Sequence, residues 1–293
     1  MLSQAFLWRL LDLEESDGRP IDLVIATKFP SYVVRHPNKV VWLVHQFRQA
    51  YDLDRTELGQ FGEDTLDRAT RRAVHRLDAT ALGEARKLFA ISANVAVRLE
   101  RSLGLEAEVL PPPPQSLDYR CEEYGDFVLS VGRLDRAKRI DLLLAAAAAR
   151  EAGKVVIVGD GPDRDRLERL SDEHGLNGRV TFLGRVDADA LADLYARCLA
   201  VYYAPVDEDL GLVPFEAFRS QKPVITTRDA GAPAEIVVDR ESGVVCEPTA
   251  AAVAEAVDWL AADPERAKEL GRSGRAVAER ATWDTVIERL LAP

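Results

Sequence analysis

Several residue types that carry chemistry in proteins are scarce in this sequence of 293 residues. It has three cysteines, which are far apart and lack metal-ligand spacing: Cys121, Cys198 and Cys246. It has four histidines and contains no HExxH or CxxC motif. We therefore expect no disulfide framework, no metal site and reduced cysteines in a cytosolic protein.

Basic residues are outnumbered by acidic ones, 38 to 49, and long apolar runs are lacking. The net charge is −11, and an acidic surface repels nucleic acid and anionic lipid, so neither is a favoured partner. The alanine-rich run after Ile140 is interrupted by Asp141 and ends at Arg150, which is too short to cross a bilayer. The first residues carry acids early and have no basic segment, so we expect no secretory leader.

The sequence does contain an alternation of short β-branched segments and longer helical patterns, which is typical of βαβ units and a parallel sheet. Helices are predicted at residues 4–15, 63–82, 92–103, 250–262, 264–281 and 283–291. Strands are predicted at residues 22–26, 40–45, 87–91 and 107–110, and then at 127–131, 154–158, 179–183, 199–203, 223–226 and 244–246. The six later strands suffice for a full doubly wound domain.

Four consecutive prolines, residues 111–114, separate these two series. Proline continues neither a helix nor a central strand, so the run marks a domain boundary. We predict a partial N-terminal Rossmann-like domain over residues 1–112 and a second Rossmann-like domain over residues 113–275. A C-terminal helix over residues 276–293 is predicted to pack back toward the first domain.

Two glutamates separated by seven residues form the strongest local motif, EDLGLVPFE, from Glu208 to Glu216. Both are expected at the carboxyl edge of the second sheet, where open α/β folds bind ligands. One carboxylate accepts both hydroxyls of a sugar diol. A helix that starts near Val213 would also direct N–H groups toward a diphosphate. The alternative is a pair of solvated loop acids.

A basic loop, GRLDRAK, follows the predicted strand at residues 127–131. Gly132 permits close backbone approach, and Arg133 and Lys138 are expected at the same sheet edge. Two cations there would neutralise a pyrophosphate without a metal. The alternative is a surface loop of mixed charge, which is our interpretation for Arg136 and Arg139.

Five motifs in a fixed order carry a family resemblance: GRLDRAK, GDGP (residues 159–162), FLGRV (182–186), EDLGLVPFE and PVI (223–225). Residues 126–283 resemble the C-terminal domain of glycosyltransferase family 4, the retaining "glycosyl transferases group 1" with the GT-B fold. The segments TKFPSYVVRHPNKVVWLVHQFRQAYDL and ISANVAVRLERSLGLEAEVLPPPP resemble parts of that family's N-terminal domain.

The resemblance implies an α/β, GT-B-like protein with two Rossmann-like domains and a cleft between them. It implies a UDP- or GDP-sugar donor and no further cofactor. Arg133 and Lys138 would hold the donor phosphates, Glu216 the ribose and Glu208 the sugar. The remaining implied contacts are the backbone at Gly132, Gly211, Leu212 and Val213, and Arg185 and Val186 beside the base. His45 would touch sugar or acceptor, or else it caps a strand end.

The implied reaction is hexose transfer with retention to a glycan, lipid or small-molecule acceptor, in the cytoplasm or at the inner membrane face. No strand with a glycine-rich loop precedes Asp22, so the N-terminal domain is expected to be incomplete. This favours, as an alternative, a nucleotide-sugar-binding module or a partner-dependent relative without transfer activity. A further alternative is another GT-B enzyme, such as an epimerase or a phosphorylase.

Three further features depart from the family pattern or carry unusual charge. Gln221 and Ala232 stand where the family commonly has glycine, so we expect a different helix cap and some crowding of the donor. The basic residues Arg68, Arg71, Arg72, His75 and Arg76 are expected near one helical face. They would contact an anionic acceptor or a membrane, or form a solvated face, which the acidic composition favours.

Overall fold

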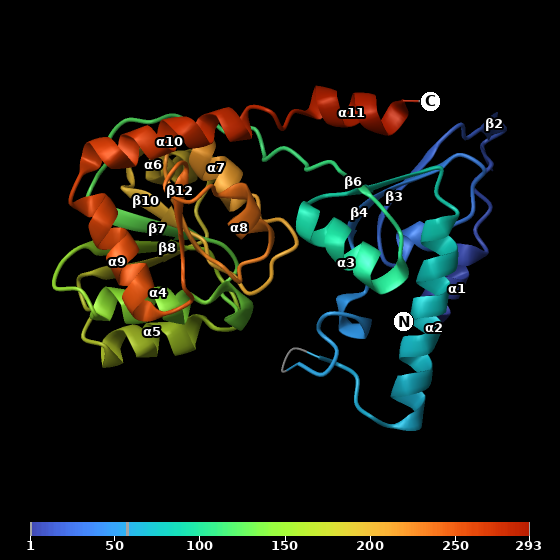
Figure 1. Cartoon of the computed structure of the whole chain (residues 1–293), viewed down its shortest axis with the longest axis horizontal. Helices are drawn as coiled ribbons and strands as arrows, with labels where there is room; N and C mark the ends of the chain where they lie inside the picture. Colours follow the sequence, from blue (N-terminus) through green and yellow to red (C-terminus); the bar gives the residue numbers. More distant parts are fainter. Residues whose placement is uncertain (1, 57–58, 293) are drawn as a thin grey trace. The chain divides into compact units, whose positions relative to one another are not determined.

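The computed structural model describes residues 2–56 and 59–292, and the chain divides into two compact units (Figure 1). Unit 1 consists of the residues up to Pro112 together with the segment that begins at Trp283. Unit 2 runs from Pro113 to Thr282. One helix was predicted over residues 276–293. The structure has two helices in this region, because α10 ends at Ala278 and α11 covers Trp283–Leu291.

Unit 2 contains a parallel sheet with the strand order β12-β11-β10-β7-β8-β9 in the described residues. The strands are β7 (Phe127–Val131), β8 (Lys154–Val158), β9 (Val180–Gly184), β10 (Ala200–Tyr202), β11 (Val224–Thr227) and β12 (Gly243–Cys246). All six strands predicted for this part of the chain are present, with small shifts at their ends. The α/β class predicted from the alternating pattern is therefore confirmed.

The strand order of unit 2 reverses between β7 and β10. The chain proceeds from β7 to β8 and β9 on one side, and then returns to place β10 on the other side of β7. Ligand sites of open α/β sheets lie at the carboxyl ends of the strands where the order reverses. The GRLDRAK loop follows β7 and the EDLGLVPFE loop follows β10, so the fold places both motifs at this point.

Helices cover both faces of this sheet, with α4 and α5 on one side and α6, α7 and α10 on the other (Figure 1). This explains why apolar runs such as β10 are buried completely. The helices are α4 (Ile140–Ala148), α5 (Arg164–Glu173), α6 (Ala188–Arg197), α7 (Val213–Arg219), α8 (Ala232–Ile236), α9 (Ala250–Ala261) and α10 (Pro264–Ala278).

Gln221 ends α7 in the conformation that usually requires glycine. Its φ is +55°, in the left-handed region. Its N–H donates to the Phe218 carbonyl, and the N–H of Lys222 donates to the Ala217 carbonyl, both at 2.9 Å or less. These are the two bonds of a Schellman cap. The expected different cap is therefore wrong, because glutamine adopts the left-handed position itself.

We expect Gln221→Gly to raise the free energy of unfolding by about 1 kcal/mol, because a non-glycine residue pays a steric cost in this region. Denaturant unfolding of both proteins measures the difference. Gln221→Ala is the matched control, since it keeps a Cβ in the same conformation and should bring no gain. Equal stability of the glycine and alanine variants would contradict this explanation.

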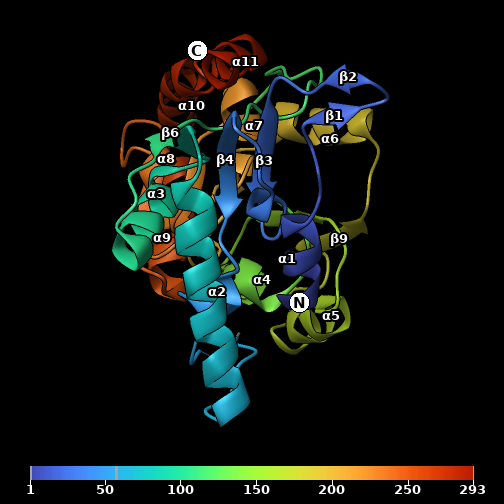
Figure 2. The same ribbon diagram turned by 90° about the vertical axis from the view of Figure 1, so that its right-hand side faces the viewer.

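Unit 1 contains a smaller parallel sheet with the order β3-β4-β5-β6 in the described residues, and Figure 2 shows β3 beside β4. The four strands predicted for this part of the chain are confirmed. The strands are β3 (Val24–Lys28), β4 (Lys39–His45), β5 (Lys87–Ala90) and β6 (Glu108–Val109), and the helices are α1 (Leu2–Arg9), α2 (Thr65–Gly83), α3 (Ala93–Leu103) and the short η1 (Ser31–Val33) and η2 (Arg48–Ala50).

The helix predicted over residues 4–15 is too long. Helix α1 ends at Arg9, and a hairpin of β1 (Glu15–Ser16) and β2 (Arg19–Pro20) follows. Asp17 and Gly18 form its turn with φ of +50° and +73°. An Asp-Gly pair is a strong hairpin signal, so this turn was recognisable from the sequence.

Helix α11 belongs to the core of unit 1. Val286 and Leu290 are buried in one cluster with Val40, Phe89 and Leu110. The Trp283 and Trp42 rings meet edge to face, with centroids 6.1 Å apart. The last helix of the chain thus completes the apolar cover of the first sheet.

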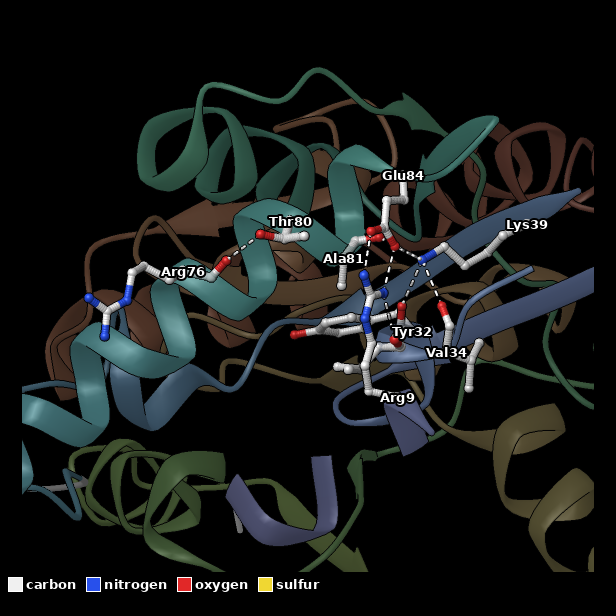
Figure 3. Close-up of polar contacts among 9 residues, drawn as sticks. Arg9, Tyr32, Val34, Lys39, Arg76, Thr80, Ala81 and Glu84 are labelled. Carbon is white, nitrogen blue, oxygen red and sulfur yellow. Dashed lines mark hydrogen bonds and ion pairs between the residues drawn. The ribbon is translucent and has the colours of Figure 1, made fainter. Parts of the chain in front are cut away.

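A buried lysine ties three segments of unit 1 together (Figure 3). The Lys39 ammonium donates to the carbonyls of Tyr32, Val34 and Ala81 at 3.1, 3.0 and 2.7 Å. Glu84, which also pairs with Arg9, lies 3.6 Å from it. Burial lowers the pKa of Lys39. These partners compensate for its desolvation, so β4, η1 and the end of α2 are held in one arrangement.

A second buried ionisable residue, Asp78, lies on α2. Its two carboxylate oxygens accept hydrogen bonds from the hydroxyls of Tyr32 and Tyr51 at 2.9 and 2.8 Å. The side chain is completely buried, and this burial raises its pKa from 3.8 to about 7. The folded protein therefore binds a proton at Asp78 in a pH range where the unfolded chain has already lost it.

We expect stability to fall as the pH rises from 5 to 7. The folded pKa lies above the unfolded value, so protons are released on unfolding in this window and stability decreases with pH. Asp78→Asn should remove on the order of 2 kcal/mol of this decrease. Urea unfolding of both proteins at pH 5, 6 and 7 measures it, and parallel pH dependences would contradict the assignment.

Four of the five basic residues predicted to lie near one face of α2 are exposed: Arg68, Arg72, His75 and Arg76. Arg71 is the exception, because its side chain is buried and pairs with Asp54. His75 also stacks on the Tyr51 ring at 4.3 Å. The solvated face favoured by the acidic composition is therefore observed for these four residues, and the prediction was wrong for Arg71. Among residues 2–56 and 59–292, no helix combines the length and apolar character needed to span a bilayer.

Candidate active site

The loop after β7 rests on the GDGP turn. A Cβ on Gly159 would lie 1.8 Å from the Gly132 carbonyl oxygen, and one on Gly161 would lie 2.2 Å from the carbonyl oxygen of Leu134. The Gly159 N–H also donates to the Gly184 carbonyl at 2.8 Å. Backbone contacts thus join three of the five motifs. No atom lies within 4 Å of a Cβ on Gly132, so its backbone stays open to a ligand.

Lys138 and Glu208 meet across the switch point. The Lys138 ammonium forms an ion pair and hydrogen bond with Oε2 of Glu208, 70 positions later in the chain. A backbone bond from Val206 to the Ala137 carbonyl, 2.8 Å long, joins the same two loops. Both charged side chains are about one-fifth exposed, so the pair is accessible to a ligand.

The backbone of Glu208 is held by the loop after β11. Its N–H donates to the Ala230 carbonyl at 2.8 Å, and its own carbonyl accepts from the N–H of Ala232 at 3.1 Å. Asp207, the preceding residue, has a left-handed φ of +46°. Such conformations persist where surrounding bonds enforce them. The backbone position from which the Glu208 side chain extends is therefore fixed at the sheet edge.

Arg139 is not the surface charge that we predicted. Its guanidinium donates to the carbonyls of Ala204 and Pro205 at 2.8 and 2.7 Å. It also forms a bidentate pair with Asp229 at 2.8 and 2.9 Å. The prediction was wrong because the loops after β10 and β11, distant in sequence, close over this side chain. Arg139 thereby joins all three loops that surround Glu208.

Arg133 has a different environment from Lys138. Its side chain is 71% exposed, and its guanidinium pairs with Asp135 at 3.0 Å. This ion pair is within its own loop, so it does not join Arg133 to the Lys138–Glu208 pair. Arg133 and Lys138 therefore each have a carboxylate partner that an anionic ligand would displace.

Glu216 lies on α7 beside a buried tyrosine. The Tyr195 hydroxyl of α6 donates to its Oε2 at 2.7 Å. Burial raises the pKa of Glu216, and the hydrogen bond from Tyr195 opposes this rise. The ring of Tyr119 packs edge to face on Tyr195 at 6.3 Å. Glu216 is thus held separately from the ion pair, with one carboxylate oxygen oriented by a phenol.

The segment between the two glutamates contains a close packing contact. Gly211 has φ of +72°, and a Cβ there would lie 2.4 Å from the Tyr203 ring. Leu212 precedes α7, which begins at Val213 as predicted. The second residue of this short helix is Pro214, which has no N–H, so its first turn offers fewer donors than expected.

Arg185 and Val186 follow β9 and are exposed and half-buried, respectively. Val186 lines a cavity of about 250 Å³ with residues of β7, β9 and α6: Phe127, Leu183, Ala190, Asp193, Leu194 and Arg197. Ala232, in contrast, is completely buried. Its methyl group does not reach the surface, so the expected crowding of a ligand is wrong for this structure.

His45 belongs to unit 1, where it ends β4. Its Nδ1 lies 2.7 Å from the carbonyl oxygen of Gln46. This local contact agrees with a residue that caps a strand end, and contact with a sugar or acceptor remains a prediction. No group of three metal-ligating side chains with metal-binding geometry occurs in the described part of the chain.

The sequence did not identify the tyrosines of this site. Tyr195 and Tyr203 are in apolar patterns that predict a core helix and a core strand, and no local signal separates their hydroxyls from those of other buried tyrosines. Arg139 had one signal, its position directly after Lys138 in a predicted sheet-edge loop. The mixed charge of that loop nevertheless favoured a solvent-exposed position.

These features define a doubly wound α/β unit with a paired lysine and glutamate at its switch point. The chain belongs to the family described as Glycosyl transferases group 1, whose model matches residues 120–277. The family resemblance inferred from the five ordered motifs is thereby confirmed.

Curated relatives share this region. The chain is 30% identical over 196 residues to alpha-1,3/1,6-mannosyltransferase ALG2 of Mus musculus, which covers 60% of the chain and 47% of the relative. It is 32% identical over 188 residues to the GDP-mannose-dependent alpha-(1-6)-phosphatidylinositol monomannoside mannosyltransferase of Mycolicibacterium smegmatis, covering 59% of the chain and 49% of the relative. The chain spans about half the length of these relatives.

A solved structure shows the same fold. Sucrose-phosphate synthase from Thermosynechococcus elongatus matches with a TM-score of 0.76 and 24% identity. The match covers 92% of this chain and 71% of that one. Both units are therefore included in the comparison, which supports the GT-B-like class.

Proposed function

We propose that this chain is a retaining glycosyltransferase that moves a hexose from a UDP- or GDP-sugar to an acceptor without a metal ion. The observation that carries the proposal is the Lys138–Glu208 pair at the switch point of unit 2, formed by two motifs of the family. A cation and a sugar-binding carboxylate at one sheet edge are what a nucleotide sugar requires.

Arg133 and Lys138 would bind the diphosphate after exchanging their carboxylate partners for its oxygens. Glu216 would accept hydrogen bonds from the ribose hydroxyls, and Glu208 from the sugar hydroxyls. The backbone at Gly132, Gly211, Leu212 and Val213 would line the phosphate and sugar positions. Arg185 and Val186 would lie beside the base, and His45 would contact sugar or acceptor.

In the proposed reaction, the bond between the anomeric carbon and the β-phosphate oxygen breaks. The acceptor hydroxyl oxygen bonds to that carbon on the same face, and its proton moves to the departing phosphate. Charge develops on the diphosphate as the bond breaks. The cationic side chains of Arg133 and Lys138 would stabilise it, which is the main catalytic contribution expected of this site.

Transfer and hydrolysis assays with labelled UDP-glucose, UDP-N-acetylglucosamine and GDP-mannose test this proposal. One relative is named for GDP-mannose and a phosphatidylinositol monomannoside, so lipid-linked acceptors and vesicles belong in the assay. We expect product with a retained anomeric configuration, unaffected by a chelator. A folded protein that neither binds nor turns over any donor would refute the proposal.

A second candidate is a nucleotide-sugar-binding module that lacks transfer activity. It is favoured by the four-stranded sheet of unit 1, in which β3 is an edge and Ile25 is 39% exposed. Under this candidate, donor binding would be measurable by calorimetry while no sugar is released. The cytoplasm, or the inner face of the membrane, is the proposed location in both cases.

A further inference from the structure

Tyr203 lies directly after β10 and is fixed on two sides. Its N–H donates to the Ile225 carbonyl at 2.9 Å. Its ring packs so closely on Gly211 that a Cβ there would lie 2.4 Å away. The residue is only 7% exposed. The position of its hydroxyl is therefore set by the sheet and by the Gly211 segment, and not by a ligand.

The Tyr203 hydroxyl bridges the two charged residues of the site. It accepts a hydrogen bond from the Lys138 ammonium at 3.2 Å and donates to Oε2 of Glu208 at 3.3 Å. Lys138 donates to that same carboxylate oxygen. Burial and the nearby Glu208 carboxylate raise the pKa of Tyr203, so the hydroxyl keeps its proton and remains a donor.

A diphosphate at this edge would compete with Glu208 for Lys138. The ammonium has three N–H donors, and phosphate oxygens are strong acceptors for them. Lys138 can turn toward the diphosphate most easily if the carboxylate retains another donor. The Tyr203 hydroxyl is such a donor, because its ring does not have to move when the lysine does.

We propose that Tyr203 is a positioning residue that holds the Glu208 carboxylate while Lys138 turns from that carboxylate to the diphosphate of a nucleotide sugar. This inference rests on the proposed function. Without the hydroxyl, Glu208 depends more strongly on Lys138, so the lysine becomes less available to the diphosphate. The effect of Tyr203 on nucleotide binding therefore depends on the charge of residue 208.

A double-mutant cycle tests this dependence. Calorimetry would measure the binding of UDP and of GDP to the wild type, Tyr203→Phe, Glu208→Gln and the double variant. Tyr203→Phe should weaken binding by about three- to tenfold when Glu208 is present, as expected for the net contribution of one hydrogen bond. In the Glu208→Gln background the same change should alter binding by less than about twofold, since no carboxylate then competes for Lys138.

Two controls separate positioning from structure. Phenylalanine keeps the ring against Gly211, so the melting temperature of Tyr203→Phe should stay within a few degrees of the wild type. Tyr124→Phe removes a hydroxyl that donates to the Gln221 carbonyl at 2.6 Å in the same unit, and it should leave UDP and GDP binding unchanged.

Each outcome of the cycle decides one question. If Tyr203→Phe weakened nucleotide binding equally in both backgrounds, or in neither, the positioning role of Tyr203 would be overturned. The proposed function would still stand as long as the wild type binds UDP or GDP. A wild-type protein that binds neither nucleotide would overturn the proposed function and this inference with it.

Discussion

Replacing Lys138 with alanine is expected to slow sugar transfer or donor hydrolysis by at least about 100-fold. The ammonium is a cation at the switch point that pairs with Glu208, and removal of one charge-stabilising group from an active site commonly costs this much. Steady-state assays with the best donor identified for the wild type measure the effect. Because the charge acts on the departing diphosphate, the loss should appear mainly in kcat.

Arg136→Ala is the matched control for this variant. Arg136 is an exposed cation in the same short helical turn, η3 (Arg136–Lys138), two positions from Lys138. Its removal lowers the loop's charge by the same amount and should change turnover by less than about threefold. Equal losses in the two variants would show that only the net charge of the loop matters, against the assigned role of Lys138.

Gly159→Ala is expected to lower the free energy of unfolding by on the order of 4 kcal/mol. The new methyl group would lie 1.8 Å from the Gly132 carbonyl oxygen, and Gly159 has φ of +125°. The cost combines backbone strain with overpacking between the GDGP turn and the basic loop. The displaced loop should also bind donor more weakly, which calorimetry at a temperature well below unfolding would detect.

Gly178→Ala separates these two contributions. Gly178 also has a positive φ, +79°, but no atom lies within 4 Å of a Cβ at that position. We expect this variant to lose only the strain cost, about 1 kcal/mol. Denaturant unfolding of both variants gives the comparison, and a Gly159 variant as stable as the Gly178 variant would exclude the close packing of the two loops.

Much of unit 2 was predictable because its information is local. Its strands are three to five residues long, and most of their residues are apolar. Strands that are buried on both faces, such as β10, require such runs, whereas the first four residues of the edge strand β9 alternate between half-buried and exposed. The motifs are equally local, since the GRLDRAK loop follows β7 directly and the EDLGLVPFE segment begins in the loop that follows β10. Their position at the carboxyl edge therefore follows from the strand assignments.

Unit 1 was harder to predict at its start. The first fifteen residues contain a helical apolar pattern, yet α1 ends at Arg9, which donates to the Val33 carbonyl at 3.1 Å and pairs with Glu84. That ion pair joins residues 75 positions apart. A contact of this kind is not visible in the local pattern, although the Asp17–Gly18 turn was a local signal that the helix ends before the hairpin.

The charge partners of the site illustrate the same limit. The basic motif predicted that Arg133 and Lys138 share one anion, and the structure shows that each also pairs with a different carboxylate, Arg133 with Asp135 and Lys138 with Glu208. Asp135 lies two positions after Arg133 in the same motif, but nothing in the sequence indicated that their side chains form an ion pair. Glu208 lies on another loop, and only the strand order brings it to Lys138.

The α/β class, the order of the strands along the chain and the family all follow from the amino-acid sequence, because apolar runs and short motifs depend on neighbouring residues alone. Which side chains meet depends on the tertiary structure: Lys138 with Glu208, Tyr203 with both, and Arg139 with the loops after β10 and β11. The physical reason is the reversal of strand order at β7. It places loops that are 65 to 90 positions apart at one sheet edge, where their side chains form ion pairs and hydrogen bonds with one another.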